Sequence, residues 1–162
     1  MKNLGERLVE FLGKPLSDPD FQSFLTEMKP YCHLGSDSYS TRRYHFEKLG
    51  FSISHCKEWD CIYSVAFHFG TKAVRTSWYA RYHDLLPANI TAEDNRVQIQ
   101  YKLGVKPFRS TPDEGYPLNP GEDYPTWWDN YHWPPFRITL IFKSPVGDMD
   151  LFGVGYTAYR LL

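Results

Sequence analysis

The feature that most constrains the fold is an alternation of apolar and polar side chains in the first half of the chain. Segments 43–47, 51–55 and 61–69 carry apolar side chains at every second position. Because successive side chains of a strand point to opposite faces, this period predicts an antiparallel meander with one wet face. A fourth strand is predicted within 76–82. In the third segment the apolar positions are Cys61, Tyr63, Val65, Phe67 and Phe69.

A pair of helices is predicted before these strands. Apolar residues recur with helical spacing over 4–12, and Gly13 and Pro15 end that segment. The second helix is predicted to begin at Asp18 and Pro19, since an acceptor side chain followed by proline suits a helix start. Its apolar face consists of Phe21, Phe24, Leu25 and Met28, and Pro30 follows it.

The segment that opens the second half carries two conflicting patterns. Apolar residues at 97, 99, 101 and 103 alternate with polar ones, as in a strand. A capping-box spacing at Thr91 and Asp94, the Ile99/Leu103 pair and the Gly104 stop are typical of a helix. We therefore predict a helix for this segment.

The end of the chain is predicted to return to strands. Segments 136–143 and 151–162 are predicted strands, and Gly153 and Gly155 indicate a bulge or a close backbone approach in the second. Between Thr111 and Pro135 the sequence has six Pro, five acidic residues and no Lys or Arg, so an irregular segment is predicted there.

Composition and charge exclude several function classes. The net charge is -1, which gives no basic field to hold nucleic acid or an anionic membrane. No apolar run reaches transmembrane length, and the N-terminus lacks the apolar core of a signal peptide. Three cysteines cannot all pair, so we expect a cytoplasmic protein with reduced thiols.

Both halves follow the same order of elements. Leu12-Gly13-Lys14-Pro15 is echoed by Leu103-Gly104-Val105-Lys106-Pro107, and helices precede strands in each half. We therefore expect a single α+β domain over 1–162. Two pseudo-repeated helix–meander units, 1–84 and 85–162, would form one antiparallel sheet with the helices packed on one face.

These residues also carry a resemblance. The run 8–20, with 86–90 and the Leu103-Gly104-x-x-Pro107 motif, resembles a group of small bacterial proteins. That group is similar in layout to the β-lactamase inhibitor protein and the outer-membrane assembly lipoproteins, whose units are two helices followed by a small antiparallel sheet. Some of its members resemble toxin immunity proteins, which implies a non-catalytic role through protein binding.

Catalytic and metal motifs are weak in this sequence. His45 and His68 fall on the polar face of predicted strands and are interpreted as solvated residues. The Cys56/Cys61 spacing is wider than a usual zinc pair, so no metal site and no cofactor are predicted. No nucleophile elbow or phosphate-binding glycine loop occurs, and the chain is predicted not to be an enzyme.

The strongest functional signal is the acidic, Trp-rich part of 111–135. Tyr and Trp side chains anchor protein interfaces, and carboxylates around them favour a partner with a basic surface. We therefore expect an immunity or inhibitor protein that occludes the active site of a cognate toxin. The alternatives are a carbohydrate site, a small hydrolase, or tryptophans that cap the core. The predicted partner-binding residues are Glu122, Asp123, Tyr124, Trp127, Trp128, Asp129, Tyr131 and Trp133.

Overall fold

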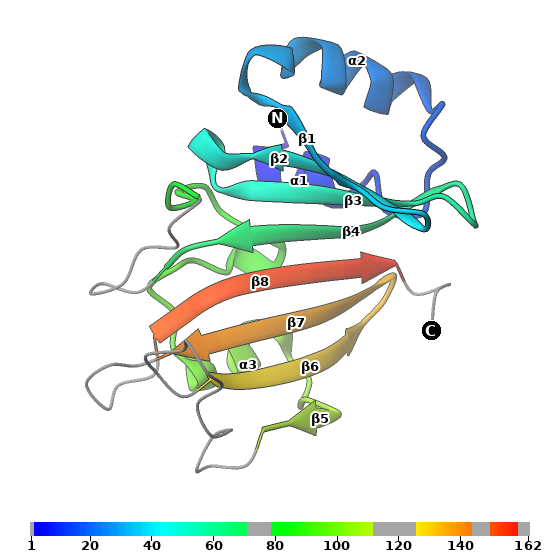
Figure 1. Cartoon of the computed structure of the whole chain (residues 1–162). Coiled ribbons are helices and arrows are strands. Elements are labelled where there is room, and N and C mark those ends of the chain that lie inside the picture. Colours follow the sequence, from blue (N-terminus) through cyan, green and yellow to red (C-terminus); the bar gives the residue numbers. More distant parts are fainter. Residues whose placement is uncertain (1, 71–78, 112–125, 144–149, 159–162) are drawn as a thin grey trace.

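The chain is an α+β protein built on one antiparallel sheet (Figure 1). The computed structural model describes residues 2–70, 79–111, 126–143 and 150–158. Its helices are α1 (Leu4–Val9), α2 (Pro19–Glu27) and α3 (Arg96–Leu103), with 3-10 turns at Lys29–Tyr31, Glu47–Leu49 and Pro87–Asn89. Its strands are β1 (His33–Asp37), β2 (Thr41–Phe46), β3 (Phe51–Cys56), β4 (Cys61–His68), β5 (Arg109–Ser110), β6 (Thr126–Trp133), β7 (Phe136–Lys143) and β8 (Asp150–Ala158).

The sheet consists of two meanders joined at their last strands. The strand order is β1-β2-β3-β4-β8-β7-β6-β5, and all neighbours are antiparallel. The seam between the meanders is the β4–β8 pairing, in which Val65 lies opposite Tyr156. Strands far apart in the sequence therefore lie side by side at the centre of the sheet (Figure 1).

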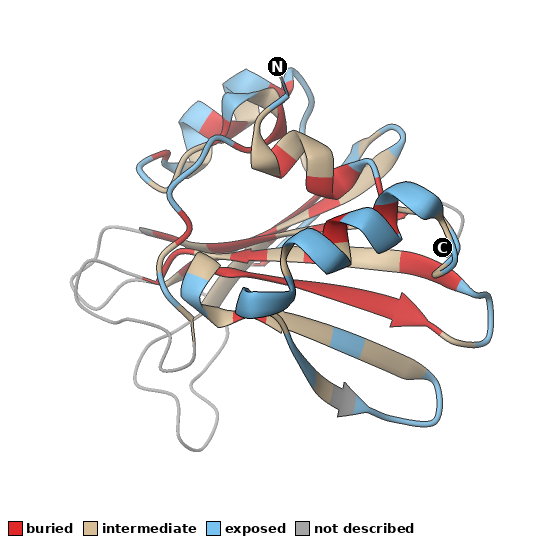
Figure 2. Cartoon of the chain, turned by 90° about the horizontal axis from the view of Figure 1, so that it is seen from above, coloured by how far each residue is buried: buried red, intermediate tan, exposed pale blue. Residues whose placement is uncertain are grey.

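Helices α1 and α3 lie behind the sheet in the view of Figure 1. Leu8 of α1 and Ile99 of α3 are fully buried in the same core cluster as Ile53, Val65 and Tyr156 of the strands. Figure 2 shows buried residues along the strands and along the helix sides that face them. Burying an aliphatic side chain of this size stabilises the fold by about 1.5–3 kcal/mol.

Helix α2 attaches to the sheet through aromatic rings. The ring centroid of Phe24 lies 5.8 Å from that of Phe46 in β2, and Phe46 stacks on Phe51 at 4.4 Å. The predicted start of α2 is confirmed, because the Asp18 side chain accepts a hydrogen bond from the Phe21 backbone N–H at 3.0 Å. Helix α1 is shorter than predicted and ends at Val9.

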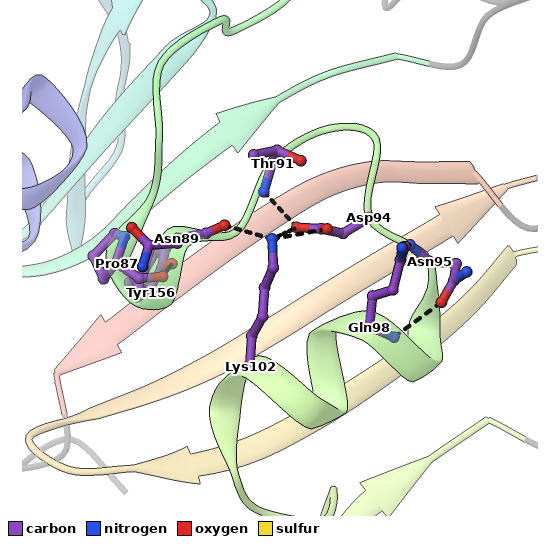
Figure 3. A network of polar contacts seen from close by, with 8 residues as sticks. All are labelled: Pro87, Asn89, Thr91, Asp94, Asn95, Gln98, Lys102 and Tyr156. Carbon is purple, nitrogen blue, oxygen red and sulfur yellow. Dashed lines mark hydrogen bonds and ion pairs between the residues drawn. The ribbon is translucent and has the colours of Figure 1, made fainter.

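The helix predicted in the second half is confirmed, but its cap lies one turn later than expected. Asn95 is the N-cap of α3: its side chain accepts from the Gln98 N–H at 2.9 Å, and Gln98 accepts from the Asn95 N–H. Asp94 instead accepts from the Thr91 N–H at 2.7 Å and from Lys102 Nζ (Figure 3). The Thr91/Asp94 spacing therefore forms a turn that fixes the linker before α3.

We expect Asn95→Ala to lower the free energy of unfolding by about 1 kcal/mol, because the N-terminal amides of α3 lose their acceptor. Urea unfolding followed by circular dichroism measures the change. Thr91→Ala is the matched control, since its side chain is not the cap and its backbone N–H still reaches Asp94. A larger loss in the control would place the helix start at Thr91.

Two predicted features differ in the structure. Residues Thr126–Trp133, predicted as irregular, form β6 and pair with β7 along its whole length. The fourth strand predicted within 76–82 falls partly outside the described residues, and Tyr79–Tyr82 forms no strand. The short edge strands β1 and β5 were not predicted, because they are too short and too polar to show a period.

The apolar alternation of β4 shifts phase at a bulge. Ser54 pairs with Ser64 and His55 pairs with Ile62, which leaves Tyr63 as the extra residue. Ile62 is therefore fully buried, and the prediction that Tyr63 points into the core is wrong. The irregularity predicted near Gly153 is confirmed, since Phe152 is the extra residue between the Ile141–Gly153 and Phe142–Leu151 pairs.

Within the described residues, no helix has the length and apolarity needed to cross a lipid bilayer.

Candidate functional site

The strand residues that alternate with the core residues form a second surface, which we call the polar face. Cross-strand register places Arg43, Ser54, Ser64, Thr157 and Arg137 in one line across β2, β3, β4, β8 and β7. Figure 1 views the sheet from the side opposite α1 and α3. The middle of this line carries small hydroxyl side chains, and an arginine stands at each end.

Strand β3 is buried along its whole length, although one side of it belongs to the polar face. Ser52 and Ser54 are 5% and 6% exposed, and each lies opposite a larger side chain of β2, His45 and Arg43 respectively. The sequence prediction of one wet face is therefore wrong for β3. The polar face is hollow where these small residues lie.

This depression, which we call the polar hollow, has a volume of about 470 Å³. That volume falls within the range of about 300–1,000 Å³ that is usual for ligand pockets. Its floor is formed by Ser52, Ser54, Ser64 and Ala66, and its walls by His33, Arg43, His45, Glu47, Tyr63, His68 and Tyr79.

One wall of the polar hollow is a stack of aromatic side chains centred on Tyr79. The His68 ring stacks on the Tyr79 ring with centroids 3.8 Å apart, and the Tyr79 hydroxyl is hydrogen-bonded to His45 Nδ1. The His33 ring stacks in turn on the His45 ring at 5.1 Å. These contacts hold three imidazoles in fixed orientations at one end of the hollow.

The two inner histidines of this wall have lowered pKa values, which favours their neutral forms. Burial, together with the charges of His45 and Arg43, lowers the pKa of His68 to about 4. Burial is also the largest cause of the lowered pKa of His45, followed by the charges of His33 and Arg43. The Nε2 atom of His68 is buried and has no hydrogen-bond partner among the described residues. A neutral imidazole with an unused nitrogen is suited to bind a polar ligand atom.

A second hollow of about 400 Å³ adjoins the first on the polar face. Tyr63 lines both hollows, because the β4 bulge turns its ring onto this face. The other side chains that line it include Trp59, which is 57% exposed, and Arg137. The two hollows together span the sheet from β2 to β7.

The structure divides the predicted partner-binding residues. Glu122, Asp123 and Tyr124 lie outside the described residues. Asp129 and Tyr131 are 2% and 1% exposed, so these two side chains are buried on the core side of the sheet. Asp129 accepts hydrogen bonds from the Arg96 guanidinium, one of them from Nε at 2.7 Å.

The three tryptophans of the predicted site point to different sides of the sheet. Trp127 and Trp133 are partly buried and pack against the core, whereas Trp128 lies on the polar face. The Arg109 guanidinium lies 5.3 Å from the Trp128 ring centroid. Because adjacent strand residues alternate, Trp127 and Trp128 do not form one platform.

The cysteines and histidines of the first half are held by local contacts. Cys56 and Cys61 lie directly opposite each other on β3 and β4 and are both buried as free thiols. His55 Nε2 lies 2.9 Å from Asp60 Oδ1. In the part of the chain that the structure describes, no group of three His, Cys, Asp or Glu side chains is placed to hold a metal ion.

The residues that sequence reasoning missed are those of the polar hollow. His45 and His68 were interpreted as solvated strand residues, but their rings are partly buried against Tyr79. The sequence does contain a signal for this site: in the alternation of the predicted strands, His45 and His68 fall on the same side as Arg43 and the serines. Tyr79 completes the wall from outside the strands, and no local sequence pattern predicts that its side chain lies there.

No protein family model, no curated protein and no solved structure matches this chain.

Proposed function

We propose that this protein is a non-catalytic binding protein that holds a protein partner on its polar face. The observation that carries the proposal is the position of Tyr63, which the β4 bulge turns outward between Arg43 and Arg137. Tyr and Arg dominate the binding energy of many protein interfaces, because they bury large areas and also form hydrogen bonds.

The size of this surface favours a macromolecular partner. Arg43 and Arg137 stand four strand steps apart, which corresponds to about 19 Å at the usual spacing of strands. Among the described residues, Arg43 donates to Ser54 Oγ and Arg137 lies over the Phe108 ring, and neither forms an ion pair with a carboxylate. A partner that presents acidic side chains would therefore gain charge-assisted hydrogen bonds at both ends of the surface.

The sharpest form of the proposal is an immunity or inhibitor protein that covers the active site of a toxin. The prediction of a partner with a basic surface now rests on Glu122 and Asp123. Asp129 no longer supports it, because its carboxylate is paired with Arg96. The carbohydrate or hydrolase alternative would have to use Trp128, because Trp128 lies on the polar face whereas Trp127 packs against the core.

We further propose that units 1–84 and 85–162 are pseudo-repeats whose helices share one face of the sheet. In support, each unit places helical segments before a four-stranded antiparallel meander. The last strands of the two meanders, β4 and β8, then pair with each other.

Affinity capture tests the proposed partner surface. Tagged protein is incubated with a lysate of the organism that produces it, and co-purifying proteins are quantified by mass spectrometry. We expect one stoichiometric partner that is reduced at least tenfold by Tyr63→Ala, because the ring is a central contact. If that partner is a toxic enzyme, one equivalent of the captured protein should abolish its activity.

The matched control is Tyr101→Ala on α3, since Tyr101 is 88% exposed and lies outside the polar face. Circular dichroism confirms that both variants are folded. Loss of the partner in Tyr101→Ala with retention in Tyr63→Ala would move the interface to α3 and refute the proposal. Equal retention in both variants would refute it as well.

A further inference from the structure

The polar hollow has features that a protein interface does not require. It is a pocket of ligand size whose floor is made of hydroxyl groups and whose wall is a fixed aromatic stack. Flat protein surfaces recognise partners without such a cavity, whereas small molecules need one to bury most of their surface. The chemistry of the lining therefore indicates what the hollow can hold.

The positive charge at this site is not neutralised within the described residues. Arg43 Nε donates to Ser54 Oγ at 3.3 Å, and the guanidinium forms no ion pair with a described carboxylate. Among the described residues, the carboxylate that lines the hollow is that of Glu47, whose Oε1 lies 3.7 Å from Nε2 of His33. The terminal nitrogens of Arg43 are therefore available to an oxyanion, which a guanidinium binds in bidentate geometry.

The floor adds neutral donors near this charge. Ser54 and Ser64 are opposite each other in the β3–β4 register, and Arg43 is opposite Ser54 in the β2–β3 register. Neighbouring strands lie about 4.8 Å apart, so both hydroxyls come within the span of a phosphate or carboxylate group and its first atoms. Hydroxyl donors and an arginine are a common combination for holding such groups.

The wall formed by His45, Tyr79 and His68 suits the rest of a ligand. Tyr79 is held between His45 by a hydrogen bond and His68 by stacking, so its position is fixed before any ligand arrives. The buried His68 Nε2 without a described partner is the kind of unsatisfied polar atom that needs an explanation in a folded protein. A ligand hydroxyl or carbonyl at this position would satisfy it.

We propose that the polar hollow binds a small molecule with a phosphate or carboxylate group, held by Arg43 and by the hydroxyls of Ser54 and Ser64. The remainder of the molecule lies against the wall formed by His45, Tyr79 and His68. This site does not depend on the protein partner proposed above, because it needs only β2, β3, β4 and Tyr79.

Titration followed by nuclear magnetic resonance tests the site on the full chain. The imidazole signals of His45 and His68 are recorded during addition of inorganic phosphate, phenyl phosphate or benzoate at constant ionic strength. We expect saturable shifts of both histidines with at least one of the two aromatic probes. Stronger binding of phenyl phosphate would assign a phosphate-bearing ligand, and stronger binding of benzoate a carboxylate-bearing one.

Arg43→Gln should weaken binding of the better probe at least tenfold, because the charged donor is lost. Arg7→Gln is the matched control: it removes the same charge from α1, where Arg7 pairs with Glu27 at 3.3 Å, and binding should not change. The absence of saturable histidine shifts with all three probes would overturn the proposal. Equal affinity in Arg43→Gln and wild type would overturn it too, whatever the outcome of partner capture.

Discussion

Arg96→Gln is expected to lower the free energy of unfolding by about 3–5 kcal/mol. Its partner Asp129 is 2% exposed, and the Arg96 guanidinium donates to both of its carboxylate oxygens. Without the guanidinium, the Asp129 carboxylate stays buried beside the hydrophobic core and has lost the cation that pairs with it among the described residues. Denaturant unfolding monitored by tryptophan fluorescence measures the change.

The control for this variant is Arg7→Gln, which breaks an ion pair whose side chains are 42% and 59% exposed. Exposed pairs of this kind contribute about 0–1 kcal/mol. A second variant, Arg96→Met with Asp129→Leu, should recover much of the lost stability because it removes both charges together. An effect of Arg96→Gln no larger than that of the control would show that the pair is not buried in solution.

The second large effect is a loss of stability in mild acid that depends on His68. Its pKa is lowered to about 4 by burial and by nearby positive charge, against about 6.5 for an unfolded chain. Below pH 6.5 the unfolded chain takes up a proton that the folded chain resists. The contribution of His68 to stability should therefore fall between about pH 6.5 and 4, by roughly 3 kcal/mol in total, and this contribution should not change further below that range.

Unfolding free energies of wild type and His68→Gln, measured from pH 7.5 to 4, isolate this contribution. The variant should lose the part of the slope that His68 supplies, whereas the exposed His83→Gln should keep the wild-type slope. The slope, and not the absolute stability, is compared, because the substitution also alters packing against Tyr79. Identical slopes in wild type and His68→Gln would contradict the assignment.

Most of the regular elements are predictable from the sequence because their patterns are local. The helix over Arg96–Leu103 competes with a strand pattern, and the Asn95/Gln98 cap with the Gly104 stop decides in favour of the helix. Strands β2, β3 and β4 lie close to their predicted positions, because the alternation of apolar and polar side chains that predicts each strand involves only residues of that strand.

The parts that were not predicted depend on contacts between distant residues. β6 carries Asp129 in the middle of its core-facing side, which interrupts the apolar period, and the residue that makes this burial possible lies 33 positions earlier. The bulge that turns Tyr63 outward is a property of the paired strands and has no signature within β4 alone. The bulge lies at the candidate site, because Tyr63 lines both hollows, so the sequence period was least informative there.

The seam between the two meanders has a consequence for how the molecule assembles. Ser64 meets Thr157 across it, a contact between residues 93 positions apart (157 minus 64), and such contacts form slowly because a long loop must close first. Arg43 and Arg137 come to stand on one surface only after this closure. A molecule that contacts both arginines therefore binds only the fully folded chain. Its binding stabilises the pairing of the two meanders, and this stabilisation increases with its concentration.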